Sequence, residues 1–180
     1  MATTPSPTKL VTGKVRLSYV NVFETNDKGK YSVAILIPKT DKATLDKVKA
    51  AIEAVKTDAK SATTWGSKFL ASFKTPLRDG DTDRDVEKSP EYKGCYFINC
   101  NSGQKPDVVD AALNPILDKS EMYSGCFGRA SVNFYPFSKD GNKGIAAGLN
   151  NVQKLGDGER LGGGSRAADD FTAVEEDFLS

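Results

Sequence analysis

The sequence has no histidine and only three cysteines. Histidine is the commonest general acid or base and a common metal ligand, so its absence excludes Ser-His and Cys-His catalytic pairs. Cys95, Cys100 and Cys126 lack the paired spacing of a zinc site, and their odd number indicates free thiols in a reducing compartment. We therefore expect no metal site and no other cofactor.

Long hydrophobic runs are also missing. No segment approaches the roughly 18 apolar residues that a membrane-spanning helix needs. The N-terminus, MATTPSPTKL, lacks the apolar region of a secretory signal. The 180 residues suffice for one domain with a real core. These features predict a globular protein without membrane association.

Acidic side chains are unevenly distributed. Residues 167–180 contain five carboxylates and no lysine or arginine, whereas the other 166 residues contain 25 basic and 19 acidic side chains, a net charge of +6. A basic body with an acidic end is typical of nucleic-acid-binding proteins. We expect a disordered tail that competes with DNA for the cationic surface and docks on partner proteins. The predicted docking residues are Asp169, Asp170, Phe171, Glu175, Glu176, Asp177 and Phe178.

Apolar patterning predicts mainly strands with two inserted helices, an α+β composition. The expected strands are 11–23, 30–38, 95–101, 125–137 and 144–156, with a short one near 107–111, and the expected helices are 41–57 and 61–73. No βαβ rhythm occurs, so an OB-fold-like, five-stranded antiparallel barrel fits best. We place this domain at 10–155, after a disordered N-terminus at 1–9 and before a Gly-rich linker at 156–166 and the acidic tail at 167–180.

The segment GCFGRASVNFYPF at 125–137 has two different faces. One face is a plain core face, whereas Phe127, Arg129 and Tyr135 lie on the other, together with small polar residues. Aromatic rings stack on unpaired bases at about 1–3 kcal/mol per base, and a nearby cation neutralises phosphate. This face is therefore a predicted platform for single-stranded DNA; the alternative is that both faces of the strand are buried.

Further candidates come from other segments. In the first strand, Val15, Leu17 and Tyr19 alternate with Lys14 and Arg16, which places the two cations on the outer face. Trp65, Phe69 and Phe73 have helical spacing, so Trp65 is either a core residue or a stacking residue at the groove border. The predicted DNA-binding residues are Lys14, Arg16, Trp65, Arg78, Phe97, Lys105, Phe127, Arg129 and Tyr135.

Two other functional classes stay open. Four aspartates alternate in RDGDTDRD at 78–85, and a metal-dependent nuclease could use this Asp79–Asp85 loop. An EF-hand is excluded, because Arg84 and Pro90 stand where that motif needs glycine and glutamate. The second alternative is a protein-interaction module whose exposed aromatic residues become buried in a partner rather than in DNA.

Several stretches resemble a family of tailed-phage single-stranded DNA-binding proteins with an OB-fold. They are PLRDGD (76–81), EYKGCYFINC (91–100), KPDVVD (105–110), YSGCFGRASVNFYPF (123–137) and KGIAAGLNNVQKLGDGE (143–159). The acidic, Phe-bearing end is similar to the tails of such proteins, although here it ends in DFLS. The resemblance implies non-enzymatic, sequence-independent DNA binding in phage replication or recombination. It also implies tail contacts with replication or recombination proteins, in the cytoplasm of an infected bacterium. A homo-oligomer or cooperative assembly on DNA stays open.

Overall fold

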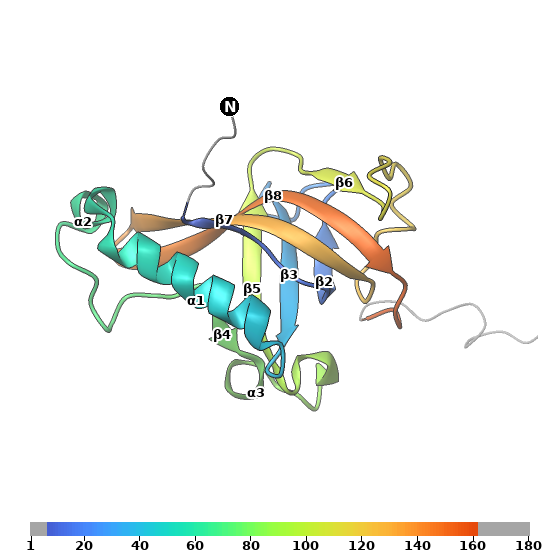
Figure 1. Ribbon diagram of the computed structural model, residues 1–180, viewed down its shortest axis with the longest axis horizontal. Helices are drawn as coiled ribbons and strands as arrows, with labels where there is room; N and C mark the ends of the chain where they lie inside the picture. The colour runs from blue at the N-terminus through green and yellow to red at the C-terminus, as the bar shows by residue number, and fades with distance from the viewer. Residues whose placement is uncertain (1–6, 162–180) are drawn as a thin grey trace, which may run out of the picture.

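Five strands form a closed ring in the computed structural model, which describes residues 7–161 (Figure 1). In ring order they are β2 (Val15–Asn21), β3 (Tyr31–Pro38), β5 (Cys95–Ser102), β8 (Asn142–Gly156) and β7 (Phe127–Lys139), which pairs back to β2. The expected mainly β, OB-like barrel is confirmed. One pairing of the ring, β5–β8, is parallel rather than antiparallel, because the β7–β8 hairpin returns the chain in the direction of β5.

Three short strands extend the ring. β1 (Lys9–Val11) pairs with β7, β4 (Arg78–Asp79) pairs with β5, and β6 (Asp107–Val109) runs parallel to β8. Lys9, which we expected in a disordered N-terminus, therefore belongs to a strand. The short helix α3 (Gly80–Asp83) lies in the Asp79–Asp85 loop, and the 3-10 turn η1 (Pro90–Tyr92) follows that loop.

The apolar patterns explain which faces are buried. On β7 the residues Gly128, Ala130, Val132 and Phe134 are buried and their neighbours are more exposed, so the predicted alternation is confirmed. On β3 five consecutive residues, Val33 to Ile37, are buried. Its inner face joins the barrel core, while its outer face is covered near Leu36 by another part of the chain.

Helix α1 (Lys42–Thr57) closes one side of the barrel (Figure 1). It begins where the Asp41 carboxylate accepts a hydrogen bond from the Thr44 amide at 3.2 Å, which satisfies one free helix N–H. Its predicted apolar stripe, Leu45, Val48, Ile52 and Val55, is buried in the core. No helix within residues 7–161 is long and apolar enough to cross a membrane.

Helix α2 (Ala59–Trp65) is shorter than the predicted helix at 61–73. Gly66 adopts a left-handed conformation (φ +73°) and ends the helix. Phe69 and Phe73 still pack on Trp65, with ring centroids 5.4 and 5.5 Å away. Trp65 is 1% exposed and its Nε1 donates to the Gly144 carbonyl at 3.0 Å. Trp65 is thus a core residue, and its predicted stacking role on DNA is wrong for this structure.

Residues 157–161 lie against the barrel rather than in a free linker. The Leu161 amide donates to the Ser124 carbonyl at 2.9 Å, and the Gly158 amide donates to the Tyr123 hydroxyl at 3.1 Å. Here the backbone of residues 159 and 160 crosses closely over Gly125, which has φ +115°. The rest of the expected linker, 162–166, the tail at 167–180, and residues 1–6 lie outside the described residues.

This crossing predicts a position-specific loss of stability. Alanine at Gly125 would be strained and its methyl group would overlap the Glu159 carbonyl, whereas Gly29 (φ +73°) has no atom within 4 Å of such a methyl group. We expect Gly125→Ala to lower the free energy of unfolding by about 3 kcal/mol or more. The matched control Gly29→Ala should lose only about 1 kcal/mol. Urea denaturation measures both, and equal losses would contradict the tight crossing.

Candidate nucleic-acid interface

The strand register places four of the predicted residues in one row across the outer face of the ring. Arg16 on β2 lies opposite Leu36 on β3, and Leu36 lies opposite Phe97 on β5. Phe127 continues the row on β7, and Arg78 continues it on β4. The fold therefore brings together four residues that were predicted from the sequence. The sequence did not indicate which segments cover them.

The centre of this row is covered. Phe97 is fully buried, with the Tyr92 ring edge-on at 5.1 Å. The guanidinium carbons of Arg78 and Arg84 lie 5.2 and 5.3 Å from the Phe97 centroid. Because residues 76–94 fold over it, Phe97 does not present a free ring to a base, and the expectation of an exposed Phe97 is wrong.

One end of the row forms an aromatic and cationic cluster. The Phe127 ring is half-buried, with Lys14 Nζ 5.3 Å and the Arg16 guanidinium 5.7 Å from its centroid. Arg16 also donates to the carbonyls of Gly125 (3.2 Å) and Glu159 (2.7 Å). The predicted association of Lys14, Arg16 and Phe127 is thus present, with the Arg16 guanidinium already bonded to carbonyl oxygens.

Next to the covered row, the outer face of β2, β3 and β5 is an open, polar groove. Its wall and floor include Tyr19, Asn21, Lys28, Ser32, Arg84 and Asn99, and we call it the Tyr19 groove. A second hollow continues from Tyr19 past Lys88 to Leu161. Amides, hydroxyls and the cations Lys28, Arg84 and Lys88 line this surface across the three strands, together with two carboxylates, Asp27 and Glu91. The cations outnumber the carboxylates, which suits a polyanion with polar bases.

Tyr19 stands at the junction of the two hollows, and the sequence analysis missed it. Instead of pointing inward with Val15 and Leu17, it is 54% exposed, because a β-bulge between Ser18 and Asn21 shifts the register. Its φ of +47° is unusual for a residue with a side chain. The apolar pattern indicates this bulge. The inward residues Val15 and Leu17 are followed by Val20 and Val22, so the inward–outward alternation shifts by one residue.

Arg84 is the second missed residue. Its guanidinium carbon lies 5.5 Å from the centroid of Tyr19, 4.8 Å from that of Tyr92 and 5.3 Å from that of Phe97. A guanidinium held over rings keeps its charge and its hydrogen-bond donors for an incoming anion. Arg84 thus places a phosphate-binding group beside the exposed Tyr19 ring.

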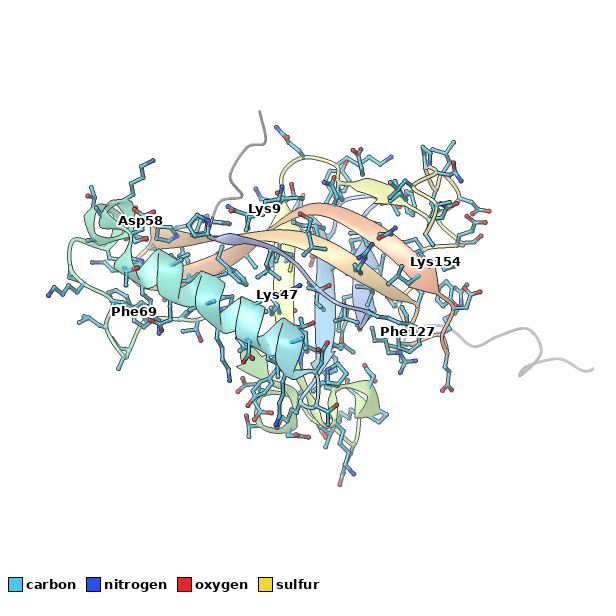
Figure 2. The ribbon with its side chains drawn as sticks, viewed as in Figure 1. Lys9, Lys47, Asp58, Phe69, Phe127 and Lys154 are labelled. Carbon is cyan, nitrogen blue, oxygen red and sulfur yellow. The ribbon has the colours of Figure 1, made fainter. Side chains whose placement is uncertain are left out.

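The remaining predicted residues lie elsewhere. Arg129 and Tyr135 point outward from β7, on the other side of the ring from β3, and Tyr135 is eight residues, roughly 27 Å, along the strand from Phe127. Arg129 donates to the Gln153 Oε1 at 2.9 Å through its Nε. Lys105 lies beside Phe23, 5.6 Å from the ring centroid, near β6. Figure 2 shows Phe127 at the opposite end of the molecule from Asp58 and Phe69.

The aspartates of the Asp79–Asp85 loop are used internally. Lys39 Nζ lies 2.9 Å from Asp79 and 2.7 Å from Asp81, and Arg78 lies 3.5 Å from Asp83. The hydrogen bond from Lys39, and then that from the Gly94 amide, lower the pKa of Asp81. Within residues 7–161 no three metal-ligating side chains converge on one point. These pairings remove the geometric support for a nuclease.

Sequence comparison assigns the family. A family profile described as the single-stranded DNA-binding protein of Enterobacter phage Enc34 matches residues 8–179. The chain belongs to this family. It is also 30% identical over 186 residues to the putative protein p50 of Acyrthosiphon pisum secondary endosymbiont phage 1, covering 95% of this chain and 98% of p50. The resemblance noted from the sequence is confirmed, and the family is one of binding proteins rather than enzymes.

Solved structures agree with this assignment. The Enc34 single-stranded DNA-binding protein superposes with a TM-score of 0.74 at 26% identity, covering 91% of this chain and 89% of that chain. Its complex with single-stranded DNA gives a TM-score of 0.73 at 26% identity, covering 86% and 90%. The single-stranded DNA-binding protein gp2.5 of bacteriophage T7 gives 0.61 at 15% identity, covering 93% and 95%, which shows the fold alone.

The left-handed backbone of Tyr19 leads to a stability prediction. Tyr19→Ala and Tyr19→Gly both remove the ring, but only glycine adopts φ +47° without strain. We expect the glycine variant to be more stable than the alanine variant by about 1 kcal/mol in urea denaturation. A more stable alanine variant would mean that the bulge is not left-handed in solution.

Proposed function

We propose that the protein binds single-stranded DNA without sequence preference, along the Tyr19 groove, during phage DNA replication or recombination. The observation that carries the proposal is the open outer face of β2, β3 and β5, where an exposed ring stands next to Arg84. OB-folds bind oligonucleotides on the face of their second and third strands, which here are β3 and β5, and at the loop after the first strand. In this protein that loop contributes Lys28 to the groove.

Each group in the groove has a distinct role. Tyr19 stacks on a base, an interaction that accepts every base because all have a π face. Arg84, Lys28 and Lys88 neutralise phosphates, and Asn21 and Asn99 offer amides to base edges. Lys14, Arg16 and Phe127 border the groove and extend the cationic path toward β7.

The acidic tail has two roles in this proposal. It docks on replication or recombination proteins, and it competes with DNA for the cationic groove. The support is that Leu161, the last described residue, lines the same hollow as Tyr19 and Lys88. A tethered polyanion acts there at millimolar effective concentration.

Alanine substitutions locate the DNA site. Loss of one stacked base corresponds to about 1–3 kcal/mol, so we expect Tyr19→Ala to weaken oligo-dT binding roughly 5- to 150-fold. Tyr135→Ala removes another exposed tyrosine (42% against 54% for Tyr19) from the β7 face and serves as the matched control, with little expected change. Fluorescence anisotropy of labelled oligo-dT in low salt measures both, after thermal denaturation has shown that the variants are folded. A larger loss for Tyr135→Ala would move the site to β7.

Salt and magnesium separate this function from its alternatives. Affinity should fall with a log–log slope of about −0.7 for each phosphate contacted, and Arg84→Ala should make that slope shallower by about one contact. A salt-independent affinity would favour apolar association of a protein-interaction module instead. Intact oligo-dT after incubation with Mg²⁺ is expected, and fragmentation would indicate a nuclease.

Truncation tests the tail. Deleting 167–180 removes the internal competitor, so DNA affinity at low salt should rise, and the gain should shrink as salt screens the tail. A full-length variant in which the five carboxylates are changed to amides separates charge from chain length and should behave like the truncation. Equal affinity of the wild-type and truncated proteins at low salt would rule out competition.

A further inference from the structure

A small apolar cluster lies outside the barrel core. Leu36, Tyr92 and Phe97 pack on the outer side of the β3–β5 pair, separated from the main core by the sheet itself. The residues over Phe97 are Arg78, Arg84 and Tyr92, all from residues 76–94, which we call the cover. The cover includes β4, α3 and η1, and Figure 1 shows β4 and α3 at one end of β3 and β5.

Solvent-exposed ion pairs hold the cover in place. Lys39, which follows β3, bonds Asp79 and Asp81 of the cover, and a further pair, Arg78–Asp83, lies within the cover; these side chains are 31–49% exposed. Ion pairs of this kind contribute little to stability and are screened by salt. The backbone pairing of the cover with β5 through β4 spans only two residues, Arg78 and Asp79.

The closed cover leaves one polar group without a partner. The Tyr92 side chain is fully buried, and within the described part of the chain its hydroxyl has no hydrogen-bond partner. Burial raises the pKa of Tyr92, against the influence of the nearby Arg84 cation and of the Ser18 hydroxyl, which lies close to the Tyr92 hydroxyl without forming a hydrogen bond of normal geometry. An unpaired buried hydroxyl opposes the closed position, because it reaches water only when the cover opens.

The covered row is the direct continuation of the Tyr19 groove. The row Arg16–Leu36–Phe97 is followed on the same strands by Ser18–Ala34–Asn99, of which Ala34 and Asn99 line the open groove. Arg84 stands at the boundary, because it contacts both Tyr19 and Phe97. Opening the cover would lengthen the groove by one row, expose the Phe97 ring and free Arg78 and Arg84 for phosphates.

From these contacts we propose that residues 76–94 are a hinged cover that single-stranded DNA displaces, and that Phe97 is a second base-stacking position beneath it. The inference rests on the proposed function and deepens it. Gly94 (φ +71°, with no atom within 4 Å of the position that a Cβ would occupy) provides the hinge before β5. Phosphates replace Asp83 on Arg78, and Asp79 and Asp81 on Lys39, so short and long oligonucleotides bind in two modes.

Hydrogen exchange on the full chain tests the cover. Saturating oligo-dT should increase amide exchange in residues 76–94 while protecting the groove strands. Lys39→Met breaks the contacts to Asp79 and Asp81 and should increase exchange in the cover without DNA. Lys56→Met, which breaks a separate exposed pair with Glu53, is the matched control and should leave the cover unchanged. Tyr92→Phe removes the unpaired hydroxyl and should slow exchange of the cover by roughly fivefold or more.

Binding measurements complete the test. Phe97→Leu keeps an apolar side chain under the cover and should weaken binding of long but not short oligo-dT, whereas Tyr19→Ala weakens both. If oligo-dT binds but the cover becomes more protected or stays unchanged, the cover inference is overturned and the proposed function stands. If no oligo-dT binds, both the proposed function and the cover inference are overturned.

Discussion

Closure of the strand ring is the constraint on which the rest of the structure depends. β8 pairs with both β7 and β5, and the parallel pairs Cys100–Ala147 and Asn101–Gly148 complete the circle. Once the ring is closed, every inward side chain belongs to one core and every outward side chain must be covered or face water. The outer face of β2, β3 and β5 therefore divides into the part under residues 76–94 and the open Tyr19 groove.

The bulge in β2 places an aromatic ring in the Tyr19 groove. With regular alternation, Tyr19 would enter the core and the groove would lose its exposed aromatic ring. The bulge instead turns the ring outward and lets Val20 and Val22 return to the core, so the strand loses no apolar packing. A left-handed tyrosine at such a place is backbone strain of the kind that functional sites retain.

Local patterns predicted much of the fold. The alternation of β7, the apolar run of β3 and the capped stripe of α1 each depend on neighbours in sequence, and each is confirmed. The site was harder to predict from the sequence, because the alternation in β5 is the same whether the outward Phe97 side chain is exposed to solvent or covered by another segment. Only the tertiary placement of Tyr92 and Arg84 decides between these, and those residues come from a segment with no periodicity.

Trp65 illustrates the same limit and has a practical consequence. It is the single tryptophan of the chain, and its indole N–H is bonded to Gly144 near the tip of the long β7–β8 hairpin. Its emission therefore reports on the seating of that hairpin against α2 and not on bases in the groove, whose nearest chromophore is Tyr19. Trp65 emission is thus a reporter of folding, whereas tyrosine emission, to which Tyr19 contributes with five other tyrosines, is the intrinsic signal that reaches the groove.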